Sequence, residues 1–144
     1  MTIALSMTNS PTAPVPSISL AIKNGKGRRI LVVDDNVDAA ESAGEILRLL
    51  GNEVSVVHDG LAAVSAVAEW HPEVVLLDIG LPGIDGYEVA RRVRQTDYGK
   101  KVMLVALTGW GQDQDKQRTS DSGFNQHWVK PVGMDKLKEI SGKG

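Results

Sequence analysis

Beyond residue 27 the chain alternates between two patterns of apolar residues. Continuous runs of aliphatic and β-branched residues are typical of buried strands, whereas apolar residues spaced three or four positions apart are typical of amphipathic helices. We therefore expect strands and helices to alternate along the chain. The predicted strands are 29–33, 53–57, 73–78, 101–107 and 124–129, and the predicted helices lie within 36–51, 61–70, 85–95, 112–123 and 134–140.

Successive strand–helix units predict a parallel sheet, because a crossover through a helix returns the chain to the same end of the sheet. Right-handed crossovers then place helices on both faces. The predicted fold class is α/β: a flavodoxin-like, doubly wound sheet of five parallel strands in the order 2-1-3-4-5, with a short last helix. Residues 1–27 are rich in serine, threonine and proline, so we interpret them as a flexible leader or linker and 28–144 as one domain.

The composition narrows the class of protein. Hydrophobic residues make up 42% of the chain and charged residues 24%, as in an ordinary globular domain. A formal net charge of -2 predicts no direct contact with nucleic acid and no attraction to an anionic membrane. The absence of cysteine excludes disulfides and thiolate metal ligands. No apolar run approaches the ~20 residues of a membrane helix, so we expect a cytoplasmic protein without membrane contact.

Ionisable residues gather at the carboxyl ends of the predicted strands, which is where open α/β sheets bind ligands. Asp34 and Asp35 follow the first strand, and Asp78 ends the third, VVLLD. Close carboxylates repel one another, and a divalent cation relieves that repulsion. Because the available ligands are oxygens, the cation that they predict is Mg²⁺.

Two further residues at this edge favour phosphate chemistry. Thr108 follows the fourth strand and Lys130 the fifth, and a hydroxyl and an ammonium group both bind phosphoryl oxygens. A carboxylate can act as nucleophile toward phosphorus and form an aspartyl phosphate. Asp78 is the best candidate, because it ends a central strand and the glycine-rich loop after it leaves access.

The segments ILVVDDN, VVLLDIGLPGIDGYE, ALTGW and VKP resemble the motifs of response-regulator receiver domains in two-component signalling, over residues 28–141. The resemblance implies that Asp78 accepts a phosphoryl group from a phosphohistidine, and that Thr108 and Lys130 bind this group. It implies Mg²⁺ ligands from Asp34, Asp35, Asp78 and the main-chain carbonyl of Gly80. It also implies a cis peptide bond between Lys130 and Pro131.

Two places deserve comparison with the family pattern. His127 stands where receivers commonly carry a tyrosine or phenylalanine that turns inward on activation, so we expect Thr108 and His127 to form the switch in its place. Gly80 and Trp110 lie two residues beyond Asp78 and Thr108. The resemblance implies that they control the access of water to the phosphoryl group, with Trp110 partly shielding it.

The leading interpretation is a phosphorylation-controlled signalling domain, which assists its own phosphorylation and dephosphorylation but is not a metabolic enzyme. The resemblance implies a histidine kinase or a histidine phosphotransfer protein as donor. It also implies a downstream protein that binds the face of 112–123, 124–129 and 134–140. We expect a monomer or a weak phosphorylation-dependent dimer.

Two alternatives stay open. One is a phosphatase of the haloacid dehalogenase type, whose nucleophile follows the first strand in a D-x-D pattern, although Asn36 stands where the second acid belongs. The other is a phosphate-independent interaction module. The sequences DGYEVARRVR and ALTGWGQDQD are similar to those of the receivers at the C-terminal end of hybrid sensor histidine kinases. A stand-alone regulator and a piece of such a kinase are both compatible with the sequence.

Overall fold

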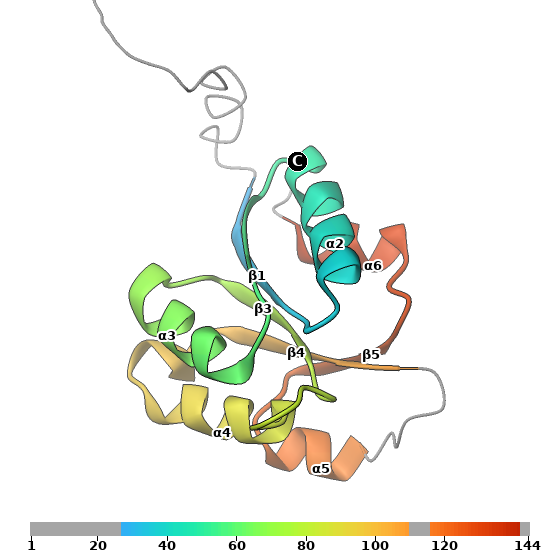
Figure 1. Ribbon diagram of the computed structural model, residues 1–144. Helices are drawn as coiled ribbons and strands as arrows, with labels where there is room; N and C mark the ends of the chain where they lie inside the picture. Colours follow the sequence, from blue (N-terminus) through green and yellow to red (C-terminus); the bar gives the residue numbers. More distant parts are fainter. Residues whose placement is uncertain (1–26, 110–115, 142–144) are drawn as a thin grey trace, which may run out of the picture.

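Five parallel strands form one sheet, with helices on both of its faces (Figure 1). The computed structural model describes residues 27–109 and 116–141. The strand order is β2-β1-β3-β4-β5, which confirms the predicted doubly wound fold. The elements are β1 Arg29–Val33, α2 Val37–Leu49, β2 Glu53–Val57, α3 Gly60–Trp70, β3 Val74–Asp78, α4 Gly86–Gln95, the 3-10 helix η1 Tyr98–Lys100, β4 Met103–Thr108, α5 Lys116–Asp121, β5 Gln126–Val129 and α6 Met134–Ile140.

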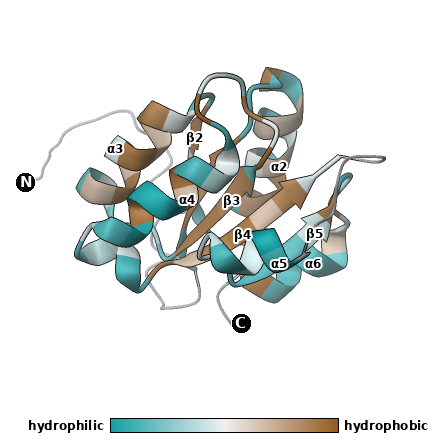
Figure 2. Cartoon of the chain, turned by 90° about the horizontal axis from the view of Figure 1, so that it is seen from below, coloured by the Kyte–Doolittle hydropathy of each residue, from teal (hydrophilic) through white to brown (hydrophobic). Residues whose placement is uncertain are grey.

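Alternate residues of each central strand belong to opposite layers of the core, as the two-residue period of a strand requires. In β1, Ile30 and Val32 pack in the layer under α2 and α6. Leu31 and Val33 pack in the layer under α3 and α4. β3 divides in the same way and is buried over its whole length. Figure 2 shows β3 and β4 largely in brown, whereas α4, α5 and α6 carry many hydrophilic residues. Among the described residues, no helix is both long and apolar enough to cross a bilayer.

The helix starts follow from local capping. The side chains of Asn36 and Asp85 accept hydrogen bonds from the main-chain N–H groups of Ala39 and Glu88, at 3.0 Å each. Each bond satisfies an N–H group that has no partner within its own helix. α2 ends at Leu49, and Gly51 follows with a φ of +97°, a backbone conformation that favours glycine.

β3, β4 and β5 each begin later than the apolar pattern predicts, β3 by a single residue, at Val74 rather than 73. β4 starts at Met103 rather than at 101, because Tyr98–Lys100 form the helix η1, which the apolar pattern does not reveal. β5 starts at Gln126 rather than at 124. In the predicted helix 112–123, the described part is Lys116–Asp121, and residues 110–115 lie outside the described residues.

Arg94 joins the end of α4 to the segments that precede β4 and β5. Its guanidinium group donates to the main-chain oxygens of Gly99 and Val102, at 2.7 Å each. It also donates to the main-chain oxygen of Gly123 at 2.7 Å and to the side-chain oxygen of Asn125 at 2.8 Å. The Arg94 side chain thus fixes two loops to one helix.

We predict that Arg94→Ala lowers the free energy of unfolding by about 2–4 kcal/mol, because a charged donor is lost and several partly buried carbonyl oxygens lose their partner. Urea denaturation measures the change. Arg91→Ala on the same helix is the control, since Arg91 forms an exposed ion pair with Glu88, which also contacts Arg92. Equal stability of the two variants would contradict this role of Arg94.

Candidate functional site

Three carboxylates converge at the carboxyl edge of the sheet because β1 and β3 pair in parallel register. Val33 lies opposite Leu77, so Asp34 and Asp78, which follow them, end side by side. Both are buried, with exposed fractions of 3% and 5%. Asp35 is exposed, and one carboxylate oxygen from each of the three aspartates lies within 4.8 Å of the others.

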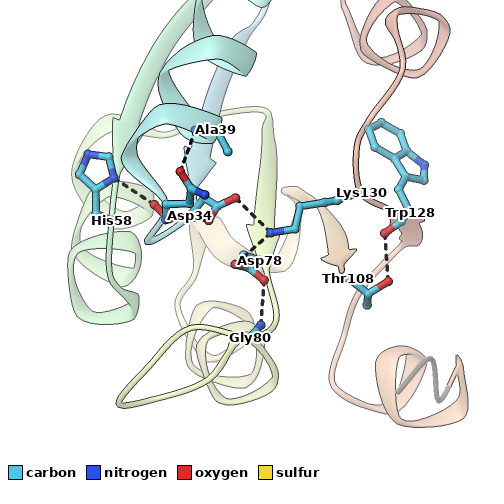
Figure 3. Close-up of polar contacts among 9 residues, drawn as sticks. Asp34, Ala39, His58, Asp78, Gly80, Thr108, Trp128 and Lys130 are labelled. Atoms are coloured by element: carbon cyan, nitrogen blue, oxygen red, sulfur yellow. Dashed lines mark hydrogen bonds and ion pairs between the residues drawn. The ribbon is translucent and has the colours of Figure 1, made fainter. Parts of the chain in front are cut away.

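Lys130 bridges the two buried carboxylates. Its Nζ lies 3.3 Å from Oδ2 of Asp34 and 3.3 Å from Oδ2 of Asp78 (Figure 3). Lys130 directly follows β5, and its main-chain N–H donates to the carbonyl oxygen of Thr108 at 2.7 Å. The Lys130–Pro131 peptide bond is cis. The lysine therefore reaches the aspartates of β1 and β3 from the edge strand β5.

Main-chain N–H groups hold the two buried carboxylates in position. Gly80 donates to Oδ1 of Asp78 at 2.9 Å, and Asn36 donates to Oδ1 of Asp34 at 3.0 Å. His58, after β2, places its Nδ1 3.0 Å from the main-chain oxygen of Asp34. This contact of His58 cannot be predicted from the sequence, because nothing in the position of His58 after a strand indicates which carbonyl its ring contacts.

Burial controls the ionisation of this cluster. It raises the pKa of Asp78, and the negative charge of Asp34 adds to that effect, while the Gly80 N–H and the Lys130 ammonium act in the opposite direction. Burial alone would lower the pKa of Lys130, but attraction to Asp78 and Asp34 outweighs it and raises that pKa. One ammonium group thus faces two buried carboxylates, so the negative charge of ionised Asp78 is incompletely compensated.

The loop after Asp78 requires a glycine at the start of α4. A Cβ atom on Gly86 would lie 2.4 Å from Cα of Ile79 and 2.9 Å from the main-chain oxygen of Asp78. Real Cβ atoms do not approach a backbone so closely, so the helix could not begin there with any other residue unless the loop moved. Gly80 is exposed within this loop, and Trp110 lies outside the described residues.

Thr108 and His127 contact each other at the end of β4 and in β5. Thr108 is fully buried, and its hydroxyl donates to the main-chain oxygen of Trp128 at 3.4 Å (Figure 3). Nε2 of His127 lies 3.2 Å from the same hydroxyl oxygen. An N–H group at Nε2 can donate to this oxygen while the hydroxyl proton is directed at Trp128.

The acidic group meets the requirements of a magnesium ion. Mg²⁺ binds oxygen ligands and is usually held by one or two carboxylates together with water. Asp34, Asp35 and Asp78 offer such oxygens from one small region, and Lys130 leaves their combined charge negative. The donor set of these side chains therefore fits Mg²⁺.

Comparison with known families agrees with this geometry. Residues 30–141 match the family model of the response regulator receiver domain. The chain belongs to this family. Receiver domains are signalling modules of two-component systems, and the fold of this chain is that of a receiver.

Relatives of this receiver domain include regulators and kinases. Sensor histidine kinase RcsC of Escherichia coli (strain K12) is 30% identical over 132 residues, which cover 92% of this chain and 14% of RcsC. The DNA-binding dual master transcriptional regulator RpaA of Synechocystis sp. is 29% identical over 109 residues, which cover 76% of this chain and 45% of RpaA. The receiver domain thus spans less than half the length of these two curated relatives.

Solved structures give the same picture. The receiver domain of sensor histidine kinase PA1611 from Pseudomonas aeruginosa PAO1 is 32% identical with a TM-score of 0.72, over 79% of this chain and 93% of that chain. That structure holds a magnesium ion in its active-site cleft. The chemotaxis response regulator CheY4 of Vibrio cholerae is 25% identical with a TM-score of 0.72, over 78% of this chain and 94% of that chain.

We predict that Asp78→Asn stabilises the metal-free receiver at neutral pH. Because the pKa of Asp78 is raised, the folded protein binds a proton at this carboxylate more tightly than the unfolded chain does. The stability of the wild type therefore falls as the pH rises from below 3.8 through the raised pKa of the folded state. Asparagine resembles the neutral acid and removes this loss. Urea denaturation with a chelator at several pH values should show an advantage for Asp78→Asn that disappears in acid.

The control for this comparison is Asp97→Asn, at a fully exposed aspartate beside η1. Its stability should follow the wild-type pH profile. An Asp78→Asn profile parallel to that of the wild type at every pH would show that the charge of Asp78 is not a cost to the folded state.

Proposed function

We propose that this receiver accepts a phosphoryl group on Asp78 from a phosphohistidine of a histidine kinase or a histidine phosphotransfer protein. The convergence of three aspartates and Lys130 at one edge of the sheet supports this proposal most directly. Asp78 is the last residue of β3, and Gly80 in the loop that follows is exposed, so a donor can approach the carboxylate. In this role the domain relays a signal and is not a metabolic enzyme.

The covalent step transfers phosphorus between two side chains. A carboxylate oxygen of Asp78 attacks the phosphorus atom, the P–N bond of the phosphohistidine breaks, and the donor's ring nitrogen keeps the electron pair of that bond. The product is an acyl phosphate on Asp78. Such a transfer needs alignment of the reacting groups and neutralisation of the phosphoryl oxygens more than it needs further covalent chemistry.

The residues of the site divide this work among them. Lys130 is already placed between Asp34 and Asp78 and is the cation that would pair with a phosphoryl oxygen. The hydroxyl of Thr108 would turn from the Trp128 carbonyl to the same group. Bound Mg²⁺, with Asp34, Asp35, Asp78 and the main-chain oxygen of Gly80 as proposed ligands, would neutralise carboxylate and phosphoryl charge together.

The two alternatives have less support. Asn36 serves as the N-cap of α2, so the second acid of a haloacid dehalogenase-type phosphatase is replaced by a structural residue, and the family match is to receivers. A phosphate-independent module would not need two buried aspartates around one lysine. The downstream partner, the proposed face of α5, β5 and α6, the oligomeric state and the cytoplasmic location all stay predictions.

We predict that acetyl phosphate with Mg²⁺ adds one acid-labile phosphoryl group to the intact protein, as detected by mass spectrometry. Asp78→Asn should abolish the addition, and a chelator should prevent it. Lys130→Ala should slow the reaction by about 100-fold, because one positive group no longer stabilises the transferring oxygens. Asp97→Asn should react like the wild type. An Asp78→Asn protein that still becomes phosphorylated would refute the proposal.

We further predict that His127→Ala weakens the hold on Thr108 in the unphosphorylated protein. The lost hydrogen bond is worth about 0.5–1.5 kcal/mol, which corresponds to a shift of about 2- to 10-fold toward the activated orientation of Thr108. The NMR signals of Thr108 should therefore move toward their positions in the phosphorylated protein. His71→Ala, at the opposite edge of the sheet, is the control. Unchanged Thr108 signals in His127→Ala would exclude this histidine from the switch.

A further inference from the structure

An apolar groove lies between α2 and the segment that joins β5 to α6. Its volume is about 440 Å³, which falls within the range of about 300–1,000 Å³ that is usual for small-molecule sites. Leu76 and Leu107 line it from β3 and β4, Ile46 lines it from α2, and Val132 lines it from the segment after β5. The groove can therefore enclose an apolar group about as large as a small organic molecule.

Small side chains on α2 leave this space free. Ala39, Ala40, Ser42 and Ala43 all line the groove, so one side of the helix carries no bulky group there. The strands that contribute Leu76 and Leu107 are each paired on both sides within the sheet. The groove thus results from the sizes of fixed side chains and does not require a movement of the chain to open.

One end of the groove is polar. Asp34, Asn36 and Lys130 belong to its lining, and Asp34 is only 3% exposed. Oδ1 of Asp34 accepts a hydrogen bond from the main-chain N–H of Asn36 at 3.0 Å, and Oδ2 accepts one from Nζ of Lys130 at 3.3 Å. A carboxylate can accept about four hydrogen bonds. These two contacts leave acceptor capacity on a buried carboxylate that lines the groove.

The charges around this end favour a positive ligand group. Carboxylate oxygens of Asp35 and Asp78 lie within 4.8 Å of one from Asp34, and Lys130 contacts Asp34 and Asp78. A negative group on a ligand would add a fourth anion beside these three. A positive group would instead offset the excess of negative charge. The groove therefore combines an apolar floor with a preference for a cation at one end.

We propose that this groove binds an amphipathic organic cation, a primary amine with an unbranched apolar tail. Its ammonium group donates to Asp34, and its tail lies against Leu107 and Val132. Such an amine is protonated at neutral pH, as lysine is. Asp34 is also a proposed ligand of Mg²⁺. If the proposed function holds, the amine therefore competes with Mg²⁺ and lowers the rate at which Asp78 is phosphorylated.

Four probes separate the contributions of head and tail. The intact protein, with its methyl groups labelled for NMR, is titrated in metal-free buffer with octylamine, octanol, octanoate and ethylamine. Octylamine should cause saturable shifts of the methyl signals of Ile46, Leu76, Leu107 and Val132. Octanol should bind about 10-fold more weakly because it lacks the charge, octanoate more weakly still, and ethylamine at least about 10-fold more weakly because it lacks the tail.

Two pairs of variants test the two ends of the groove. Ala43→Leu should fill the apolar space and abolish the octylamine shifts, whereas Ala68→Leu, at an exposed position of α3, should not. Asp34→Asn should weaken octylamine about 10-fold, to the level of octanol, and leave octanol binding unchanged. Asp38→Asn is the control for charge, since Asp38 is exposed in the first turn of α2.

Several results would overturn the proposal. Equal binding of octanol and octylamine, or tighter binding of octanoate, would show that the groove does not select a cation. Shifts that grow without saturation would indicate an adventitious additive only. Shifts of the same methyl signals that depend on protein concentration alone would assign the groove to a second copy of the chain. Because the titrations contain neither Mg²⁺ nor a phosphodonor, their outcome is independent of whether Asp78 accepts phosphate.

Discussion

The burial of two like charges beside each other constrains this structure more than any other feature. Asp34 and Asp78 are held together by the parallel pairing of β1 and β3, and both are almost completely buried. Such an arrangement is unfavourable unless positive charge or hydrogen-bond donors compensate it. Lys130 and the N–H groups of Gly80 and Asn36 supply part of that compensation. The remaining negative charge favours the binding of a cation. Under the proposed function, a bound cation and Lys130 would then attract the oxygens of the phosphoryl group.

The strand order explains why these groups come from distant parts of the sequence. β1 and β3 occupy the centre of the sheet, so their ends cannot move independently, while β5 forms an edge from which Lys130 reaches across. Thr108, at the end of β4, lies between these two regions and contacts His127 of β5. A change of charge at Asp78 can therefore alter β5 by two routes. One is Lys130, which directly follows β5, and the other is Thr108, whose hydroxyl contacts His127 of β5.

The strands, their order and the clustering of acids could be predicted from sequence, because continuous apolar runs that end in aspartate indicate both a buried strand and the edge where it stops. The details that could not be predicted depend on contacts between remote residues. The short helix η1 has no apolar period, and the contacts of Arg94 and His58 involve main-chain oxygens that a sequence pattern does not specify.

Asn52 has a consequence for how this domain can be combined with others. Through its side chain it brings Arg28 and Ser141 together at the edge of the sheet farthest from the aspartates. A fold whose two ends meet on the side remote from its chemistry tolerates circular permutation and insertion into a host protein. A peptide joining residue 141 to residue 28 would need to be only a few residues long, because Asn52 contacts both.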